Sequence, residues 1–174
     1  MKSPGILSHL ASILALPFTV VVIVPFLLLK SGSGEPSQYL DNLISWIRWS
    51  MFFIFAIAGL SLFIWTNLLF DQKGKGTLAP WNPTKQLVVV GPYQYMRNPM
   101  ITSVILLLLA EALFFNAEAI FVWALLFFSF NHLYFIVKEE PDTLKRFGDD
   151  YREYKTNVPR WIPRLSPWKS EKDA

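Results

Sequence analysis

Residues 100–137, MITSVILLLLAEALFF-NAE-AIFVWALLFFSFNHLYFIV, decide the fold because two long apolar runs follow one another almost without a break. Only the tripeptide NAE separates Met100 to Phe115 from Ala119 to Val137. A helix that crosses a bilayer needs about 20 mostly apolar residues, so the second run is long enough and the first is short. So brief a connection places consecutive helices antiparallel. The stretch therefore predicts a tight helical hairpin with its turn at one membrane surface.

Two further apolar runs, Ile6 to Leu29 and Leu43 to Phe70, precede the hairpin. Hydrophobic residues make up 53% of the chain and its mean hydropathy is +0.35, which is too apolar for an ordinary soluble domain. The first run is too long for a signal peptide, and Pro17 and Pro25 interrupt it. We therefore predict an all-α, polytopic membrane protein with about four transmembrane helices, embedded in the lipid bilayer.

The positive charges indicate how the chain is oriented. Formal net charge is +3, and Lys and Arg gather between Asp71 and Asn98 and after Val137. The positive-inside rule places both segments in the cytoplasm, and four spans then put both termini there too. We expect no nucleic-acid partner, because the charges form no basic groove, and no metal, because the chain has no cysteine and two histidines. The loop Gly74 to Pro83 is predicted to be the hinge between the two halves.

The segment before the hairpin, GPYQYMRNPM from Gly91 to Met100, is unusual for a chain entering a membrane. Its two prolines forbid a continuous helix and favour extended geometry before each of them. In an extended segment Tyr93, Tyr95 and Arg97 project to one side, where two aromatic faces and a cation would suit an anionic or adenine-bearing ligand. Alternatively, the tyrosines mark the membrane interface and the arginine marks the inner side.

A second polar block, KEEPDTLKRFGDDYREYKTNVPRWIP, runs from Lys138 to Pro163. Its apolar residues recur every three or four positions, which predicts an amphipathic cytoplasmic helix that lies on a membrane or protein surface. Gly148 marks a kink or a close approach. The helix either anchors the tail or forms part of a site. Glu139 and Glu140 favour a site, because carboxylates beside a membrane usually have a partner.

His132 lies in the last apolar run, on one helical face with Ile136 and Glu139. That face would carry polar groups toward the two cytoplasmic blocks. The histidine is either a hydrogen-bonded packing residue or a member of the site.

Together, the two blocks resemble the isoprenylcysteine carboxyl methyltransferase family of integral-membrane enzymes, which is also similar to phospholipid methyltransferases. The resemblance covers roughly Thr77 to Pro163 and divides the chain into an N-terminal transmembrane pair (1–76), a methyltransferase core (77–163) and a tail (164–174). The matching residues are Gly91, Pro92, Tyr93, Arg97, Asn98 and Pro99, then Glu139, Glu140, Phe147, Gly148, Tyr151, Tyr154, Val158, Pro159, Arg160 and Pro163.

The resemblance implies that S-adenosylmethionine binds between the cytoplasmic end of the hairpin and the C-terminal helix, and that a lipophilic methyl acceptor arrives from the bilayer. The residues expected to take part in catalysis are Arg97, Glu140 and Arg160. Those expected to bind the cofactor are Gly91, Pro92, Tyr93, Tyr95, Arg97, Asn98, Pro99, His132, Glu139, Glu140, Tyr151 and Tyr154. At position 98 this chain has asparagine, whereas the eukaryotic prenylcysteine enzymes have histidine. This difference weakens the inference that the chain acts on their substrate.

The sequence does not decide which chemical group accepts the methyl group. A carboxylate, as in a prenylcysteine, is already a nucleophile at neutral pH and needs no base. A lipid headgroup amine must lose a proton, and Glu139, Glu140 or His132 would then be the base. Two rival functions are a membrane scaffold that has kept the fold without activity and an NADPH-dependent reductase of the sterol type. Measuring whether the protein binds S-adenosylmethionine, NADPH or neither would distinguish these functions.

Overall fold

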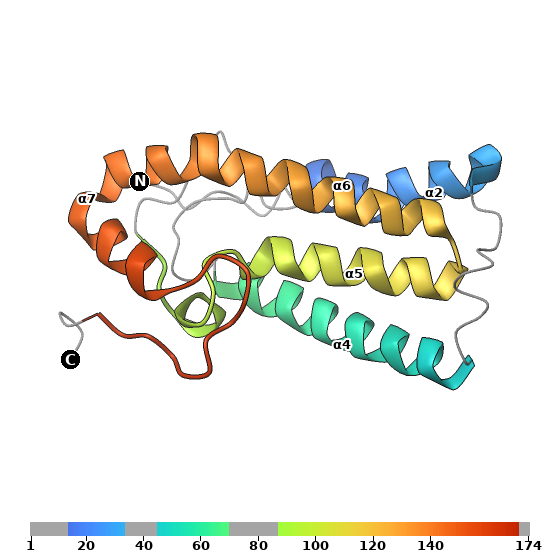
Figure 1. Cartoon of the computed structure of the whole chain (residues 1–174), viewed down its shortest axis with the longest axis horizontal. Coiled ribbons are helices and arrows are strands. Elements are labelled where there is room, and N and C mark those ends of the chain that lie inside the picture. The colour runs from blue at the N-terminus through green and yellow to red at the C-terminus, as the bar shows by residue number, and fades with distance from the viewer. Residues whose placement is uncertain (1–13, 34–44, 70–86, 171–174) are drawn as a thin grey trace.

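The computed structural model describes residues 14–33, 45–69 and 87–170 of the 174-residue chain. Those residues are mainly helical and contain no β-strand, as predicted. Helices α2, α4, α5 and α6 lie lengthwise beside one another, and α7 bends away at one end of the bundle (Figure 1). The predicted hinge Gly74 to Pro83 and the boundary at Thr77 lie outside the described residues.

The predicted hairpin is present. Helix α5 (Pro99–Phe115) ends where Asn116 adopts the left-handed conformation with φ 53°, and α6 (Glu118–Tyr134) starts two residues later. Asparagine tolerates this conformation better than most residues, so it reverses the chain at little cost. The Ala117 amide donates to the carbonyl of Ala112 at 3.0 Å, which closes the end of α5. Buried Ala112, Ala117 and Ile120 pack together at the turn.

Helix α4 (Ser45–Leu69) packs along α5 and fills most of the predicted run Leu43 to Phe70. Gly59 is buried at the crossing. A Cβ atom there would lie 3.1 Å from the backbone nitrogen of Leu107 and from the carbonyl oxygen of Ser103. A small residue therefore lets the two helix backbones approach closely, as is common between helices in membranes.

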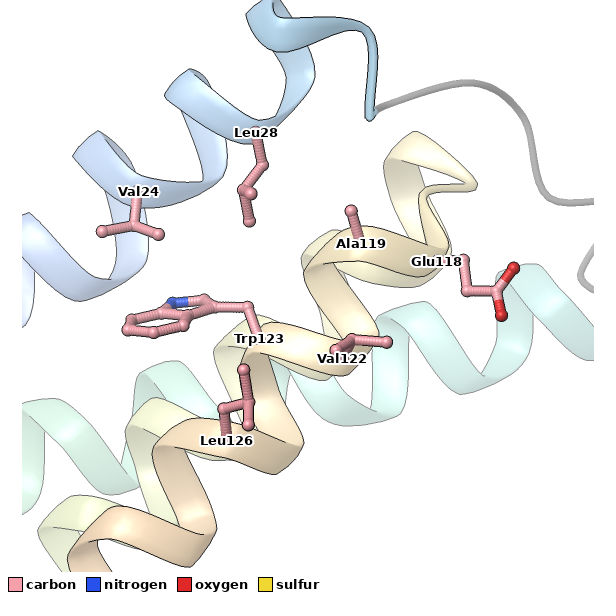
Figure 2. A pocket seen from close by; sticks show the side chains of 7 residues that line it. All are labelled: Val24, Leu28, Glu118, Ala119, Val122, Trp123 and Leu126. Carbon is pink, nitrogen blue, oxygen red and sulfur yellow. The ribbon is translucent and has the colours of Figure 1, made fainter.

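The N-terminal run is helical where it is described, from Leu14 onward, and residues 6–13 of the predicted span lie outside that part. It comprises η1 (Leu14–Ile23), α2 (Val24–Leu28) and η2 (Leu29–Ser33). The indole of Trp123 on α6 donates to the carbonyl of Val20 at 3.1 Å. Between α2 and α6 lies a largely apolar groove of about 630 Å³ with Glu118 at its edge (Figure 2).

Among the residues that the structure describes, two helices are long and apolar enough to cross a membrane. They are Ser45–Leu69 and Glu118–Asn157, the latter formed by α6, η5 (Phe135–Glu139) and α7 (Glu140–Asn157). Only 11% and 17% of their most apolar windows are buried, whereas a core helix of a soluble protein is mostly buried. The exposed side chains are large and apolar, including Phe130 at 66% and Val137 at 74%. Such surfaces indicate contact with lipid. The described part of the chain also contains the shorter apolar helices Pro17–Gly32 and Pro99–Phe115. Four spans with cytoplasmic termini stay predictions.

Candidate functional site

The loop before α5 and the tail after α7 are joined by backbone hydrogen bonds, although more than 60 residues separate them along the chain. Figure 1 shows the yellow-green loop beside the red tail at the end of the bundle. Two amides of the loop donate to the tail and two amides of the tail donate to the loop. The bonds are Arg97 to Pro159 (2.9 Å), Asn98 to Arg160 (3.3 Å), Arg164 to Tyr95 (2.9 Å) and Trp168 to Gln94 (3.0 Å). The two sequence blocks therefore form one structural unit.

The loop does not have the extended geometry that its prolines predicted. Residues Gly91–Gln94 form the 3-10 helix η4, in which Gly91 supplies a φ of 59° at the first position and Pro92 fixes a helical φ at the second. A Cβ at Gly91 would lie 2.8 Å from Leu69 and 3.2 Å from the ring of Trp65, so the loop also packs against the end of α4. The prediction that Tyr93 and Tyr95 share one face of a strand is therefore wrong, and the Tyr93 side chain is buried.

The tyrosines of α7 attach this helix to the loop. The Tyr154 hydroxyl donates to the carbonyl of Tyr93 at 2.7 Å, and Tyr151 and Tyr154 pack with Val158 in a buried cluster. Leu87, Val89, Leu144, Phe147 and Trp168 surround that cluster. Desolvation raises the pKa of the Tyr93 and Tyr154 hydroxyls above their ordinary value, so both are neutral phenols. The apolar stripe of α7 thus packs against the protein.

Glu140 lies at the centre of a group of charged side chains, directly after the apolar part of the long helix. Its Oε1 accepts hydrogen bonds from Arg97 Nη1 (2.6 Å) and Arg160 Nε (2.7 Å), and its Oε2 lies 2.8 Å from Lys155 Nζ. Arg97 also donates from Nε to the carbonyl of Val158 at 2.9 Å. The Glu140 and Arg97 side chains are 6% and 10% exposed, so each holds the other in a fixed geometry. We call these four side chains the Glu140 cluster.

The Glu140 cluster has more positive than negative charge. Burial opposes ionisation of Glu140, but hydrogen bonds from Lys155 and Arg160 and the charge of Arg97 outweigh burial and hold its pKa below the ordinary value. Glu140 is therefore an ionised carboxylate that faces three cations. The cluster as a whole attracts anions, and a depressed pKa makes Glu140 unsuited to act as a general base.

The shape of α7 brings Lys155 to Glu140. Gly148 has φ 55° and ψ −125°, which is outside the helical region, and it kinks the helix at this point. Along a straight helix 15 residues span about 22 Å, far beyond the reach of an ion pair. The kink turns the second half of α7 back toward its start, so that Lys155 contacts Glu140.

A scan against protein-family models matched the phospholipid methyltransferase model over residues 49–150. The chain belongs to this family. The family is part of the group of integral-membrane methyltransferases that resemble isoprenylcysteine carboxyl methyltransferase, so the predicted relationship is confirmed. Membership and the two apolar helices indicate a membrane methyltransferase. A search of curated proteins found no match.

The phospholipid methyltransferase match contains most of the described bundle. It starts at Trp49 in α4, before the point where the motif resemblance starts, and it includes Arg97, the hairpin and Glu140. It ends at Asp150, so the contacts of Arg160 and Lys155 with Glu140 are known from the structure of this chain and not from the family match.

The predicted site residues form two groups and two single residues, His132 and Glu139. Arg97, Glu140 and Arg160 converge in the Glu140 cluster, with the Tyr151 hydroxyl 3.5 Å from Arg97. The loop and its attachment to α7 and the tail are formed by Gly91, Pro92, Tyr93, Tyr95, Asn98 and Tyr154, and Pro99 begins α5. The His132 side chain contacts Trp161, whose Nε1 donates a hydrogen bond to His132 Nδ1 at 2.9 Å. Glu139 is exposed beside the cluster. Roles in binding and catalysis stay predictions for all of them.

Lys155 and Trp161 were not predicted to lie at or beside the Glu140 cluster. Lys155 resembled any solvent-exposed lysine of an amphipathic helix, and only the kink at Gly148 places it on Glu140. The position of Trp161 in the sequence was informative, because a tryptophan next to an arginine after a membrane span is typical of the membrane interface.

Proposed function

We propose that this chain transfers a methyl group from S-adenosylmethionine to a lipophilic acceptor held in the bilayer, at the junction of the 91–98 loop, the start of α7 and the tail. The main support for this proposal is the Glu140 cluster, in which three cations surround one buried carboxylate at the end of an apolar bundle. Family membership supports methyl transfer as the reaction class.

The residues present fit this cofactor. Its amino-acid part carries a carboxylate, and the surplus positive charge of the Glu140 cluster suits that group. Both Glu140 oxygens are already engaged by Arg97, Arg160 and Lys155, so Glu140 has no free oxygen for the cofactor's ammonium. When bound, S-adenosylmethionine supplies a methyl group on a sulfonium, which is a good electrophile.

The protein's part in such a reaction is alignment and exclusion of water. Arg97 and Arg160 orient anionic groups, because guanidinium donors lie in a plane and Glu140 fixes that plane. Glu140 acts through these arginines and is a positioning residue. A lipid amine must lose a proton before it attacks, and exposed Glu139 is the carboxylate beside the cluster that remains for this task.

The family description favours a phospholipid as the acceptor, in which case the nucleophile is a headgroup amine. The surplus of cations favours a lipid carboxylate, as in a prenylcysteine, because such a group pairs with arginine. Both acceptors reach the cluster from the bilayer.

Transfer of labelled methyl from S-adenosylmethionine, measured in lipid extracts, tests the proposal. The purified protein is placed in nanodiscs of phosphatidylethanolamine, of phosphatidylcholine, or of phosphatidylcholine with an added prenylcysteine. We expect label in the first or third lipid and none with phosphatidylcholine alone, whose headgroup nitrogen is already fully methylated. Absence of label from both test lipids, with folded protein, contradicts the proposed function.

A further inference from the structure

An aromatic group lies beside the Glu140 cluster and has no role in the function proposed so far. Trp161, which follows Arg160 in the tail, packs against Phe128 (5.1 Å between ring centroids), Phe135 (5.7 Å) and His132 (6.2 Å) on the long helix. Phe128 also stacks on His132, with 23° between the ring planes. The tail is therefore held against the bundle by a set of four rings.

The hydrogen bond within this group determines where the histidine carries its proton. The Trp161 indole is a donor only, and it donates to His132 Nδ1 at 2.9 Å. Nδ1 must then be unprotonated, so the proton of the neutral imidazole is on Nε2. No partner for Nε2 lies among the described residues, and the side chain is half-buried. His132 thus offers one N–H donor and cannot remove a proton through either nitrogen without losing the bond to Trp161.

The surroundings of His132 indicate which molecule receives this bond. Neighbouring residues of the helix are apolar and exposed, with Leu133 at 58% and Ile136 at 45%. On the other side, Trp161 is joined through the chain to Arg160, which contacts Glu140. His132 is thus next to exposed apolar side chains on its own helix and is linked, through Trp161 and Arg160, to Glu140.

We propose that Trp161 fixes His132 as an Nε2–H donor to an anionic oxygen of the acceptor lipid. The inference rests on the proposed function and deepens it, because it makes His132 part of the acceptor site and not the cofactor site. The acceptor class is a lipid with an oxyanion close to the methylated atom. A phosphate beside a headgroup amine and the carboxylate of a prenylcysteine both satisfy this requirement.

The kinetic test compares Trp161→Phe, which keeps the ring and removes the donor, and His132→Gln with the wild-type protein in nanodiscs. Trp123→Phe is the matched control, because it also removes one indole donor, in this case the donor to the carbonyl of Val20 in η1. We expect KM for the acceptor to rise about tenfold in both site variants, as for loss of one hydrogen bond to a charged group, with the Kd of S-adenosylmethionine unchanged. Equal weakening of cofactor and acceptor binding, or no effect on either, overturns the inference.

A second measurement does not depend on turnover. The chain has two histidines, so ¹⁵N-histidine NMR of the full-length His9→Gln variant observes His132 alone. We expect the Nε2–H form in the wild-type background and a mixture of forms in Trp161→Phe. If the partner of Nε2 is a phosphate, its signal should shift when maltoside detergent is replaced by phosphatidylcholine or phosphatidylethanolamine nanodiscs. If the partner is a carboxylate, the signal should shift when prenylcysteine is added to the protein in detergent.

An Nδ1–H form, or an Nε2 signal that none of these lipids shifts, overturns the inference even where the protein transfers methyl groups. Conversely, a protein that neither binds S-adenosylmethionine nor transfers label refutes the proposed function, while the NMR result still decides whether His132 contacts a lipid oxyanion.

Discussion

Glu140→Gln is expected to abolish methyl transfer and to lower the free energy of unfolding by about 3 kcal/mol, the typical cost of removing one partner from a buried ion pair. The amide leaves Arg97, Arg160 and Lys155 without their common anion. For a chain of this size the loss corresponds to a decrease in Tm of about 10 °C, measurable by thermal unfolding in detergent. Glu153→Gln on the same helix is the matched control and should leave Tm and turnover near the wild-type values.

The effect of Glu140→Gln should depend on pH. The pKa of Glu140 is lower in the folded protein than its ordinary value, so the ionised carboxylate stabilises the folded state above that value, about 4.3. The contribution is lost as the pH falls through the folded-state pKa. The difference in Tm between wild type and variant should therefore be full at pH 7 and should narrow below about pH 4. A difference that stays constant down to pH 3 contradicts the assignment of the ionised form.

Gly148→Ala is expected to weaken S-adenosylmethionine binding about tenfold, the cost of losing one charge-assisted hydrogen bond. At φ 55° and ψ −125° an alanine is strained by about 1 to 3 kcal/mol, whereas no atom lies within 4 Å of the added Cβ. The variant therefore tests the backbone conformation without a steric clash. If the kink opens, Lys155 leaves Glu140 and the cluster loses a cation.

Gly32→Ala is the control for this experiment, because Gly32 also has a positive φ and open space around it but lies in η2, in a different segment. It should lower Tm without changing cofactor affinity, which calorimetry measures in both variants. Equal affinity of Gly148→Ala and wild type contradicts a role for the kink in building the cluster.

The hairpin was predictable because its determinants are local. Two apolar runs joined at Asn116 leave the chain no other way to bury its backbone polar groups in a membrane than two helices and a sharp turn. The meeting of Arg97, Glu140 and Arg160 was predictable only through the resemblance, since each block alone is consistent with ordinary interfacial residues.

The remaining parts of the site depend on interactions between distant segments, which the sequence does not display. The 3-10 turn at Gly91 arises partly from contact with Leu69 and Trp65, and the contact of Lys155 arises from the kink at Gly148. The bond from Trp161 to His132 depends on how the tail returns to the long helix. Hydrophobic periodicity predicts which face of a helix is buried, but it does not predict the direction that the helix takes after a kink.

Calorimetric titration of the purified protein in nanodiscs with S-adenosylmethionine, with NADPH titrated in parallel, tests the central claim most directly. We expect saturable binding of S-adenosylmethionine that Arg97→Ala abolishes, and no binding of NADPH. Failure of the folded wild-type protein to bind S-adenosylmethionine would contradict the account and favour a scaffold that has kept the fold, whereas binding of NADPH alone would favour a reductase.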